Sequence, residues 1–339
     1  MRVRSFYGFK FIPPVLVFWA GCAVEKGDLK PFAPLPESFD SRKNSGTEAK
    51  LKLGRMLYFD PRLSAGGAVS CNTCHPLDRY GVDGEPVSTG HRGLKGNRNA
   101  PTVYNAAGHL EQFWDGRAPD VEEQAKGPIL NPVEMAMPNE QAVVRVLKAI
   151  PEYGALFAEA FPGEKDPVTF DNVARAIGAF ERKLRTPSRW DRYLEGQDAA
   201  LSAAEKAGFQ VFTRTGCASC HSGPLLGGNL YQKLGIVHPW PDDADMGVFM
   251  VSGKEADKMV FKVPSLRNVA ETAPYFHNGK VATLPEAVRK MAFYQLGKVL
   301  TNDEVEAIIL WLRTLTGELP STYIRPPRLP GLDSARGSE

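Results

Sequence analysis

Several features are scarce in this sequence, and each shortage narrows what the protein can be. Its 339 residues include only five cysteines and six histidines, and strand-like alternation of polarity is rare. The formal net charge is only +2, which argues against a polyanionic partner such as nucleic acid. The apolar run at residues 11–20 is too short to span a bilayer. What remains is an ordinary globular composition, long enough for about two domains.

Four of the five cysteines lie in two copies of one motif, Cys-x-x-Cys-His. The pair of cysteines is also half of a zinc site, but that interpretation needs a second pair about 15–20 residues further on, and neither motif has one. The motif is the attachment signature of haem c, in which two thiols add to the haem vinyl groups and the histidine binds the iron. The residues are Cys71, Cys74 and His75 in the first copy and Cys217, Cys220 and His221 in the second.

The N-terminus resembles an export signal, which places the chain outside the cytoplasm, where bacteria attach haem c. A basic stretch (Arg2, Arg4 and Lys10) precedes the apolar run. The run ends in Trp-Ala-Gly-Cys22, which is similar to a lipoprotein processing site. We interpret residues 1–22 as a signal peptide and expect a periplasmic protein. Three outcomes stay open for this segment: lipid anchoring through Cys22, ordinary cleavage, or retention of the segment as an anchor.

The two motifs divide the chain into halves, and the helical patterns agree with that division. We expect a linker over residues 23–46, an N-terminal haem domain over 47–195 and a C-terminal haem domain over 196–339. Ser202 and Glu205 form a capping box that opens the helix leading to the second motif. The expected fold is mostly α, with two cytochrome c-like domains that each hold one covalently bound haem near their interface. Helices are expected from near residue 47 and over 141–149, 171–184, 203–212 and 302–315.

The side chain opposite each histidine decides whether a haem carries electrons or reacts. For the second haem, Met291 is favoured because it follows the motif by some tens of residues, just ahead of the closing helix. A thioether ligand raises the reduction potential. For the first haem, Met135 fits the spacing of an ordinary electron carrier, whereas His91 lies in a glycine-flanked loop that could act as a gate. The other candidates are Met246, Met250, Met259, His238 and His277 for the second haem, and Met56, Met137 and His109 for the first.

Five further segments, in order around the two motifs, make the chain resemble the bacterial dihaem cytochrome c peroxidases over nearly its whole mature length. This resemblance implies reduction of hydrogen peroxide to water, with electrons from a small periplasmic cytochrome c or cupredoxin. It also implies a homodimer. The segments are Ser88-Thr-Gly-His91, Asn99-Ala-Pro-Thr-Val-Tyr-Asn105, Gln112-Phe-Trp-Asp-Gly-Arg117, Asn131-Pro-Val-Glu-Met135 and Ala273-Pro-Tyr-Phe-His277.

The resemblance assigns different roles to the two haems. The N-terminal haem would be the low-potential site of peroxide reaction, and the C-terminal haem, with Met291 as its axial ligand, the high-potential site where electrons arrive. By the same resemblance, His91 would be the distal ligand of the first haem in the resting oxidised enzyme. The other matching positions are Glu134 as acid–base residue, Gln124 beside it, Trp114 between the haems, and Asn99, Thr272 and Pro274 as calcium ligands.

The acid–base role of Glu134 also has a chemical reason, because cleavage of peroxide needs one proton moved from the inner to the outer oxygen; without the resemblance, a solvated loop carboxylate is the favoured interpretation. A carboxylate in a dry site can take and return that proton.

Two rival functions stay open. One is a dihaem electron-transfer cytochrome, and the other is a dihaem oxidase of the kind that matures methylamine dehydrogenase, which has Tyr where the Met ligand stands. Tyr294 lies close to Met291, so that choice depends on register.

Overall fold

The structure, a computed structural model, describes residue 24 and residues 26–332. The expected signal segment, with Cys22, therefore lies outside the described residues. Helices predominate, and the only strands named in the described part are two short ones, so the expectation of a mostly α fold is confirmed. The α-helices are α1 (Lys26–Leu29), α2 (Glu48–Phe59), α3 (Cys71–Cys74), α4 (Val121–Leu130), α5 (Glu140–Lys148), α6 (Pro151–Ala160), α7 (Phe170–Glu181), α8 (Arg189–Leu194), α9 (Ala203–Thr215), α10 (Phe249–Ser252), α11 (Leu284–Leu296) and α12 (Asn302–Leu312).

Short 3-10 helices and one small sheet complete the architecture. The strands β1 (Tyr231–Lys233) and β2 (Val260–Lys262) pair antiparallel, with Tyr231 opposite Lys262. None of the described helices has the length and apolar character needed to cross a membrane. The 3-10 helices are η1 (Pro61–Leu63), η2 (Leu77–Arg79), η3 (His91–Gly93), η4 (Ala106–Gly108), η5 (Asp198–Ala200), η6 (Cys217–Ser219), η7 (Glu255–Asp257) and η8 (Arg313–Leu315).

The expected helices form, and their polar N-caps explain where they begin. Ser202 accepts from the backbone N of Glu205, while the Glu205 carboxylate accepts from Ser202 N at 2.8 Å, so the capping box at α9 is confirmed. Thr301 caps α12 in the same way with Glu304. Thr169 caps α7. Helices α4, α6, α8 and α11 were not expected, because they are short or contain proline within an irregular pattern.

Each half of the molecule has its own hydrophobic core, built on one close helix crossing. In the N-terminal half, α2 crosses α7 so closely that a Cβ on Gly54 would lie 1.8 Å from the Ala176 carbonyl oxygen. In the C-terminal half, a Cβ on Gly208 of α9 would lie 2.0 Å from the Ala307 carbonyl oxygen of α12. In both halves a glycine thus permits close packing of the two helices that lie beside the haem motif.

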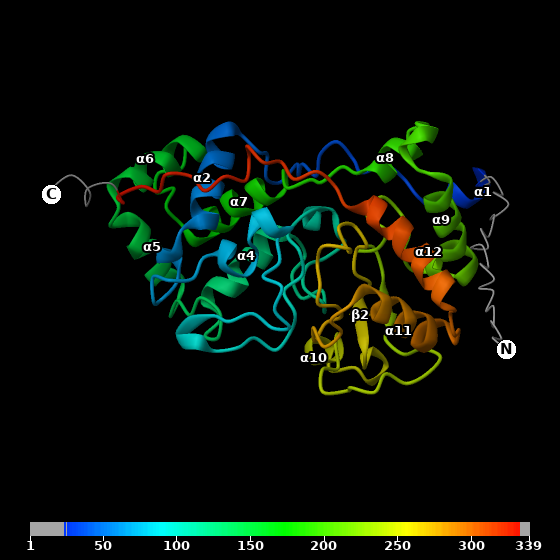
Figure 1. The fold of residues 1–339 in the computed structure, drawn as a ribbon. Coiled ribbons are helices and arrows are strands. Elements are labelled where there is room, and N and C mark those ends of the chain that lie inside the picture. The colour runs from blue at the N-terminus through cyan, green and yellow to red at the C-terminus, as the bar shows by residue number, and fades with distance from the viewer. Residues whose placement is uncertain (1–23, 25, 333–339) are drawn as a thin grey trace, which may run out of the picture.

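The ends of the described chain cross between the two halves. Phe32, close after α1, packs in the core formed by α9 and α12, whereas Ile324 packs in the core of α2 and α7. Figure 1 shows these crossings: the blue start lies beside α9, and the red end runs back over α7 and α2. Each end of the described chain therefore packs in the core of the opposite half. These contacts fix the positions of the two halves and of the cavities between and beside them.

Candidate functional site

A largely apolar cavity in the C-terminal half contains the second motif. Cys217, Cys220 and His221 line it together with Met291, which lies on α11. The Nδ1 atom of His221 lies 3.1 Å from the Leu226 carbonyl oxygen. Because that oxygen can only accept, Nδ1 carries the proton and Nε2 is left bare, as a metal-binding imidazole requires.

A second cavity, in the N-terminal half, contains the first motif. Cys74 and His75 line it, and His75 Nδ1 lies 3.1 Å from the Gly81 carbonyl oxygen. Burial lowers the pKa of both His75 and His221, which keeps these imidazoles neutral. Paired thiols, an oriented neutral imidazole and a cavity beside them are what a covalently attached haem requires, so both sites fit the group.

The two cavities differ in what faces the motif. Glu134 and Gln124 line the N-terminal cavity with His75, so three of the residues expected at the reactive haem are brought together. The amide of Gln124, on α4, has no hydrogen-bond partner in the described part of the chain and can donate to a ligand. Met135 and Met137 instead pack in the N-terminal core, so neither lines the cavity of His75.

The other candidate ligands also separate by position. Met291 and His277 line the C-terminal cavity, while Met246, Met250, Met259 and His238 do not. Tyr294 does not line it either; its ring packs against Trp240, with 4.9 Å between the ring centroids. The helical register of α11 thus turns Met291 towards the motif and Tyr294 away from it. Of the remaining N-terminal candidates, Met56 packs against the core and His109 lines a third cavity.

His91 is not among the residues that line the N-terminal cavity. Its ring lies near Gly66, where an added Cβ would stand 3.3 Å from Nδ1. Its backbone N donates to the Glu134 carbonyl oxygen at 2.7 Å. Gly90 permits this contact, since a Cβ there would lie 2.2 Å from the Val133 carbonyl oxygen. The loop with His91 thus rests on the segment with Glu134, and a distal-ligand role for His91 stays a prediction.

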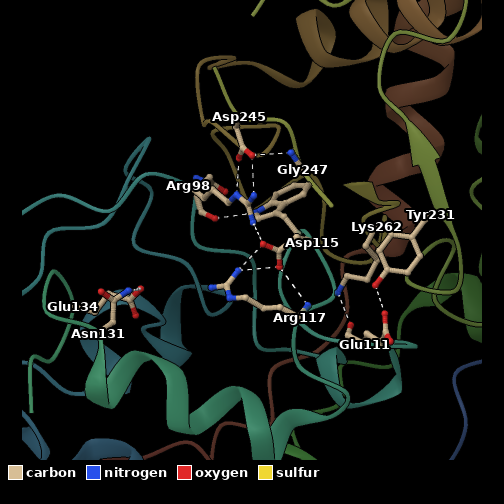
Figure 2. Close-up of polar contacts among 12 residues, drawn as sticks. Arg98, Glu111, Asp115, Arg117, Asn131, Glu134, Tyr231, Asp245, Gly247 and Lys262 are labelled. Atoms are coloured by element: carbon tan, nitrogen blue, oxygen red, sulfur yellow. Dashed lines mark hydrogen bonds and ion pairs between the residues drawn. The ribbon is translucent and has the colours of Figure 1, made fainter. Parts of the chain in front are cut away.

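Glu134 has the electrostatic setting of an acid–base residue. Burial raises its pKa, while a hydrogen bond from Asn131 and the charge of Arg117 act in the opposite direction. Asn131 Nδ2 donates to Glu134 Oε1 at 2.7 Å, a contact drawn in Figure 2. The carboxyl group is therefore desolvated but still held in one orientation, which suits proton transfer inside the cavity.

Trp114 lies where the cavities meet. It lines the N-terminal cavity, the C-terminal cavity and the third cavity between them, and its Nε1 donates to the Asn99 carbonyl oxygen at 3.0 Å. Arg98, next to Asn99 in the chain, connects the two halves near Trp114. It binds Asp115 in its own half and Asp245 in the other, with N–O distances of 2.5–2.8 Å (Figure 2). The Trp114 ring is thus anchored by the Asn99 carbonyl oxygen, beside an arginine that pairs with carboxylates of both halves.

The third cavity brings together Asn99, Thr272 and Pro274, the residues expected to bind calcium. Asn99 Nδ2 donates to the Glu85 and Pro86 carbonyl oxygens, which leaves its Oδ1 as an acceptor. Within the described residues no cluster of three or more His, Cys, Asp or Glu side chains could hold a metal ion. Neutral carbonyl and amide oxygens are nevertheless ligands that calcium accepts, so these residues fit the ion.

The sequence did not identify two polar groups at this interface. Arg98 belongs to no recognised motif, and its partners Asp115 and Asp245 lie far apart in the chain. Lys262 is buried where the C-terminal cavity and the third cavity adjoin, and it stands in an otherwise apolar run, Met-Val-Phe-Lys-Val-Pro. A lone charge inside such a run was the available signal, since burying a charge is costly unless something compensates it.

The helical fold and the two histidine-lined cavities define a protein with two haem c domains. A family model for di-haem cytochrome c peroxidase matches residues 48–199, and one for cytochrome c matches residues 205–316. The chain belongs to the dihaem cytochrome c peroxidase family. It is therefore an enzyme that binds two haem c groups.

Particular relatives support this assignment. The chain is 47% identical over 306 residues to a cytochrome c551 peroxidase of Pseudomonas aeruginosa, covering 88% of this chain and 87% of that protein. It is 38% identical over 309 residues to the methylamine utilization protein MauG of Methylorubrum extorquens, covering 87% and 86%. A solved structure of a MauG-like protein associated with microbial copper homeostasis has 30% identity and a TM-score of 0.76, covering 86% of this chain and 97% of that one.

Proposed function

We propose that this enzyme reduces hydrogen peroxide to two waters in the periplasm, using two electrons and two protons. Peroxide would react in the N-terminal cavity, and electrons would arrive at the C-terminal one. The observation that carries the proposal is the asymmetry of the cavities: Glu134 and Gln124 line the one with His75, and Met291 lines the one with His221.

When bound, the two haems supply an iron that coordinates peroxide and two centres that store and pass electrons. Glu134 takes the proton of the inner peroxide oxygen and returns it to the outer oxygen, so that water can leave. Gln124 donates a hydrogen bond to the bound oxygens and orients them. Trp114 shortens the distance that electrons cross between the two cavities, which it lines on both sides.

We assign His91 the role of a gate. It would bind the first haem in the resting oxidised enzyme and leave when the second haem is reduced. The loop that carries it rests on the Glu134 backbone, and its exposed residues 92–95 leave room for movement. A calcium ion held by Asn99, Thr272 and Pro274 would stabilise the active arrangement of the two halves.

The donor would be a small cytochrome c or cupredoxin that docks beside the C-terminal cavity. Ile236, Val237 and Phe293 are 55%, 51% and 40% exposed. They adjoin the cavity because Gln295, a lining residue of the same helix as Phe293, accepts from the backbone N of Gly235 and Ile236. An apolar patch beside a redox centre suits brief contact with a donor, as weak redox encounters bury little area.

The location and assembly follow the family expectation. We propose periplasmic export through residues 1–22, anchoring by lipidation at Cys22 as one form of the mature enzyme, and a homodimer. Met291 in the cavity, with Tyr294 outside it, supports a peroxidase over a maturation oxidase.

Steady-state turnover tests the proposed function. Purified dihaem protein should oxidise a reduced small cytochrome when peroxide is added, before or after half-reduction, and calcium should increase the rate. Absence of peroxide-dependent oxidation under all of these conditions would refute the proposal.

A further inference from the structure

Lys262 is a buried cation that borders both the C-terminal haem cavity and the third cavity, and the residue is 7% exposed. Its backbone N donates to the Trp114 carbonyl oxygen at 2.9 Å, which connects strand β2 to the backbone of the residue that lines all three cavities. Figure 2 shows the Lys262 amine near Glu111 and Tyr231.

The Lys262 amine contacts no carboxylate in the described part of the chain, although the charges of Glu111 and Asp115 lie near enough to raise its pKa. Its Nζ atom contacts the Glu111 carbonyl oxygen at 2.8 Å and His109 Nδ1 at 3.2 Å, both of them neutral. The Glu111 carboxylate instead accepts from the Tyr231 hydroxyl. The other Lys and Arg side chains that line these cavities have carboxylate partners: Arg98 with Asp115 and Asp245, Arg117 with Asp115, and Arg267 with Asp191.

A neighbouring donor, on His109, lacks a hydrogen-bond partner in the described chain. Since the ammonium group donates to His109 Nδ1, the proton of the neutral imidazole lies on Nε2. That nitrogen is buried and has no hydrogen-bond partner among the described residues. His109 lines the third cavity, as Lys262 does. An ammonium group without a carboxylate contact and an unsatisfied imidazole N–H thus border the same space.

We propose that Lys262 and His109 form the binding subsite for a propionate carboxylate of the C-terminal haem. Burying an ammonium group is costly unless a negative charge contacts it, and the haem supplies carboxylates that could make this contact. Without that partner, burial lowers the pKa of Lys262 to about 8. The pair therefore acts as a positioning element for the haem, and it is not a catalytic group.

A fixed positive charge at this point has a consequence for redox chemistry. It favours the haem state that carries one more electron, so it raises the reduction potential of the C-terminal haem. Loss of the charge should lower the equilibrium constant for reduction by about tenfold, which corresponds to 59 mV for a one-electron couple. Lys262 would thus add to the effect of Met291.

Spectroelectrochemical titration of the purified dihaem protein tests this inference. Lys262→Gln should lower the potential of the high-potential haem by about the stated amount, whereas Lys262→Arg, which keeps the charge, should stay close to the unmodified protein. Lys258→Gln is the matched control, since Lys258 is partly exposed, pairs with Glu255 and lines none of the three cavities. The control should leave the potential unchanged.

Three results would overturn the inference. The first is equal potentials in Lys262→Gln and Lys258→Gln with both haems attached. The second is an equal fall in Lys262→Arg. If Lys262→Gln does not retain two haems, the variant His109→Gln serves in its place. We expect it to lower the potential of the high-potential haem by a smaller amount. An unchanged potential in this variant is the third result that would overturn the inference. The inference rests on the proposed function only in taking the C-terminal haem as the high-potential one. Failure of peroxide turnover would therefore not contradict the propionate subsite. An unchanged potential in the variants would likewise not contradict the peroxidase proposal.

Discussion

The hydrogen bond from Asn131 to Glu134 should set where the enzyme loses activity in acid. Asn131 Nδ2 donates to Glu134 Oε1 at 2.7 Å and favours the charged carboxylate. Burial raises the pKa of Glu134, and Asn131 is the first of two groups that oppose this rise. Asn131→Ala removes that opposition and leaves the burial in place, so the pKa of Glu134 should rise further.

The size and sign of the effect follow from the contact. A hydrogen bond to a charged group contributes about 1.5–3 kcal/mol, and one pKa unit corresponds to about 1.36 kcal/mol. Glu134 is only partly buried, so the lower end applies and the shift should be about one unit. Glu134 first accepts a proton, so it must be ionised. Activity is therefore present above its pKa and lost as the pH falls through it, about one unit higher in the variant.

The pH profile of kcat/KM for peroxide measures this shift, because its acid limb reports the free enzyme. Asn139→Ala is the matched control: Asn139 caps α5 through a hydrogen bond from Ala142 N, outside the cavity. The control should cost about 1 kcal/mol of stability and leave the profile unchanged. An acid limb in Asn131→Ala that coincides with that of the unmodified enzyme would refute the role given to Glu134.

Three further predictions address the other proposed roles. His91→Gly should be active without prior reduction, whereas Arg92→Gly, in the same loop at a residue with φ of 53°, should still need it; the lag before peroxide turnover distinguishes them. Asn99→Ala should weaken calcium binding, measured by calorimetry on chelated protein, and unchanged affinity would remove Asn99 from the ligand set. Val237→Asp should raise KM for the donor cytochrome severalfold and leave the rate of peroxide reaction with prereduced enzyme unchanged; an unchanged KM would exclude the apolar patch.

The features predicted well from sequence are those whose cause lies within a few neighbouring residues. The haem motifs are one example, and the Ser202–Glu205 capping box is another, since its donors and acceptors are three residues apart. The joint placement of Glu134 and Gln124 was obtained from resemblance, because local sequence does not indicate which segments meet.

The parts that could not be predicted depend on contacts between distant segments. Arg98 meets Asp245 across the interface, and Lys262 meets His109 although they lie in different halves. Neither pair has a fixed spacing in the chain, so the sequence does not indicate which partner each charge meets. The position of His91 outside the cavity is similar: it depends on how Gly90 packs against the Glu134 segment.

The two haems should differ in reactivity, and spectra of the half-reduced protein test this most directly. With only the high-potential haem reduced, the enzyme should show one high-spin ferric haem that binds cyanide, because the N-terminal site is then open. Two low-spin, six-coordinate haems and no cyanide binding would instead identify an electron-transfer cytochrome and contradict the roles assigned to His91, Gln124 and Glu134.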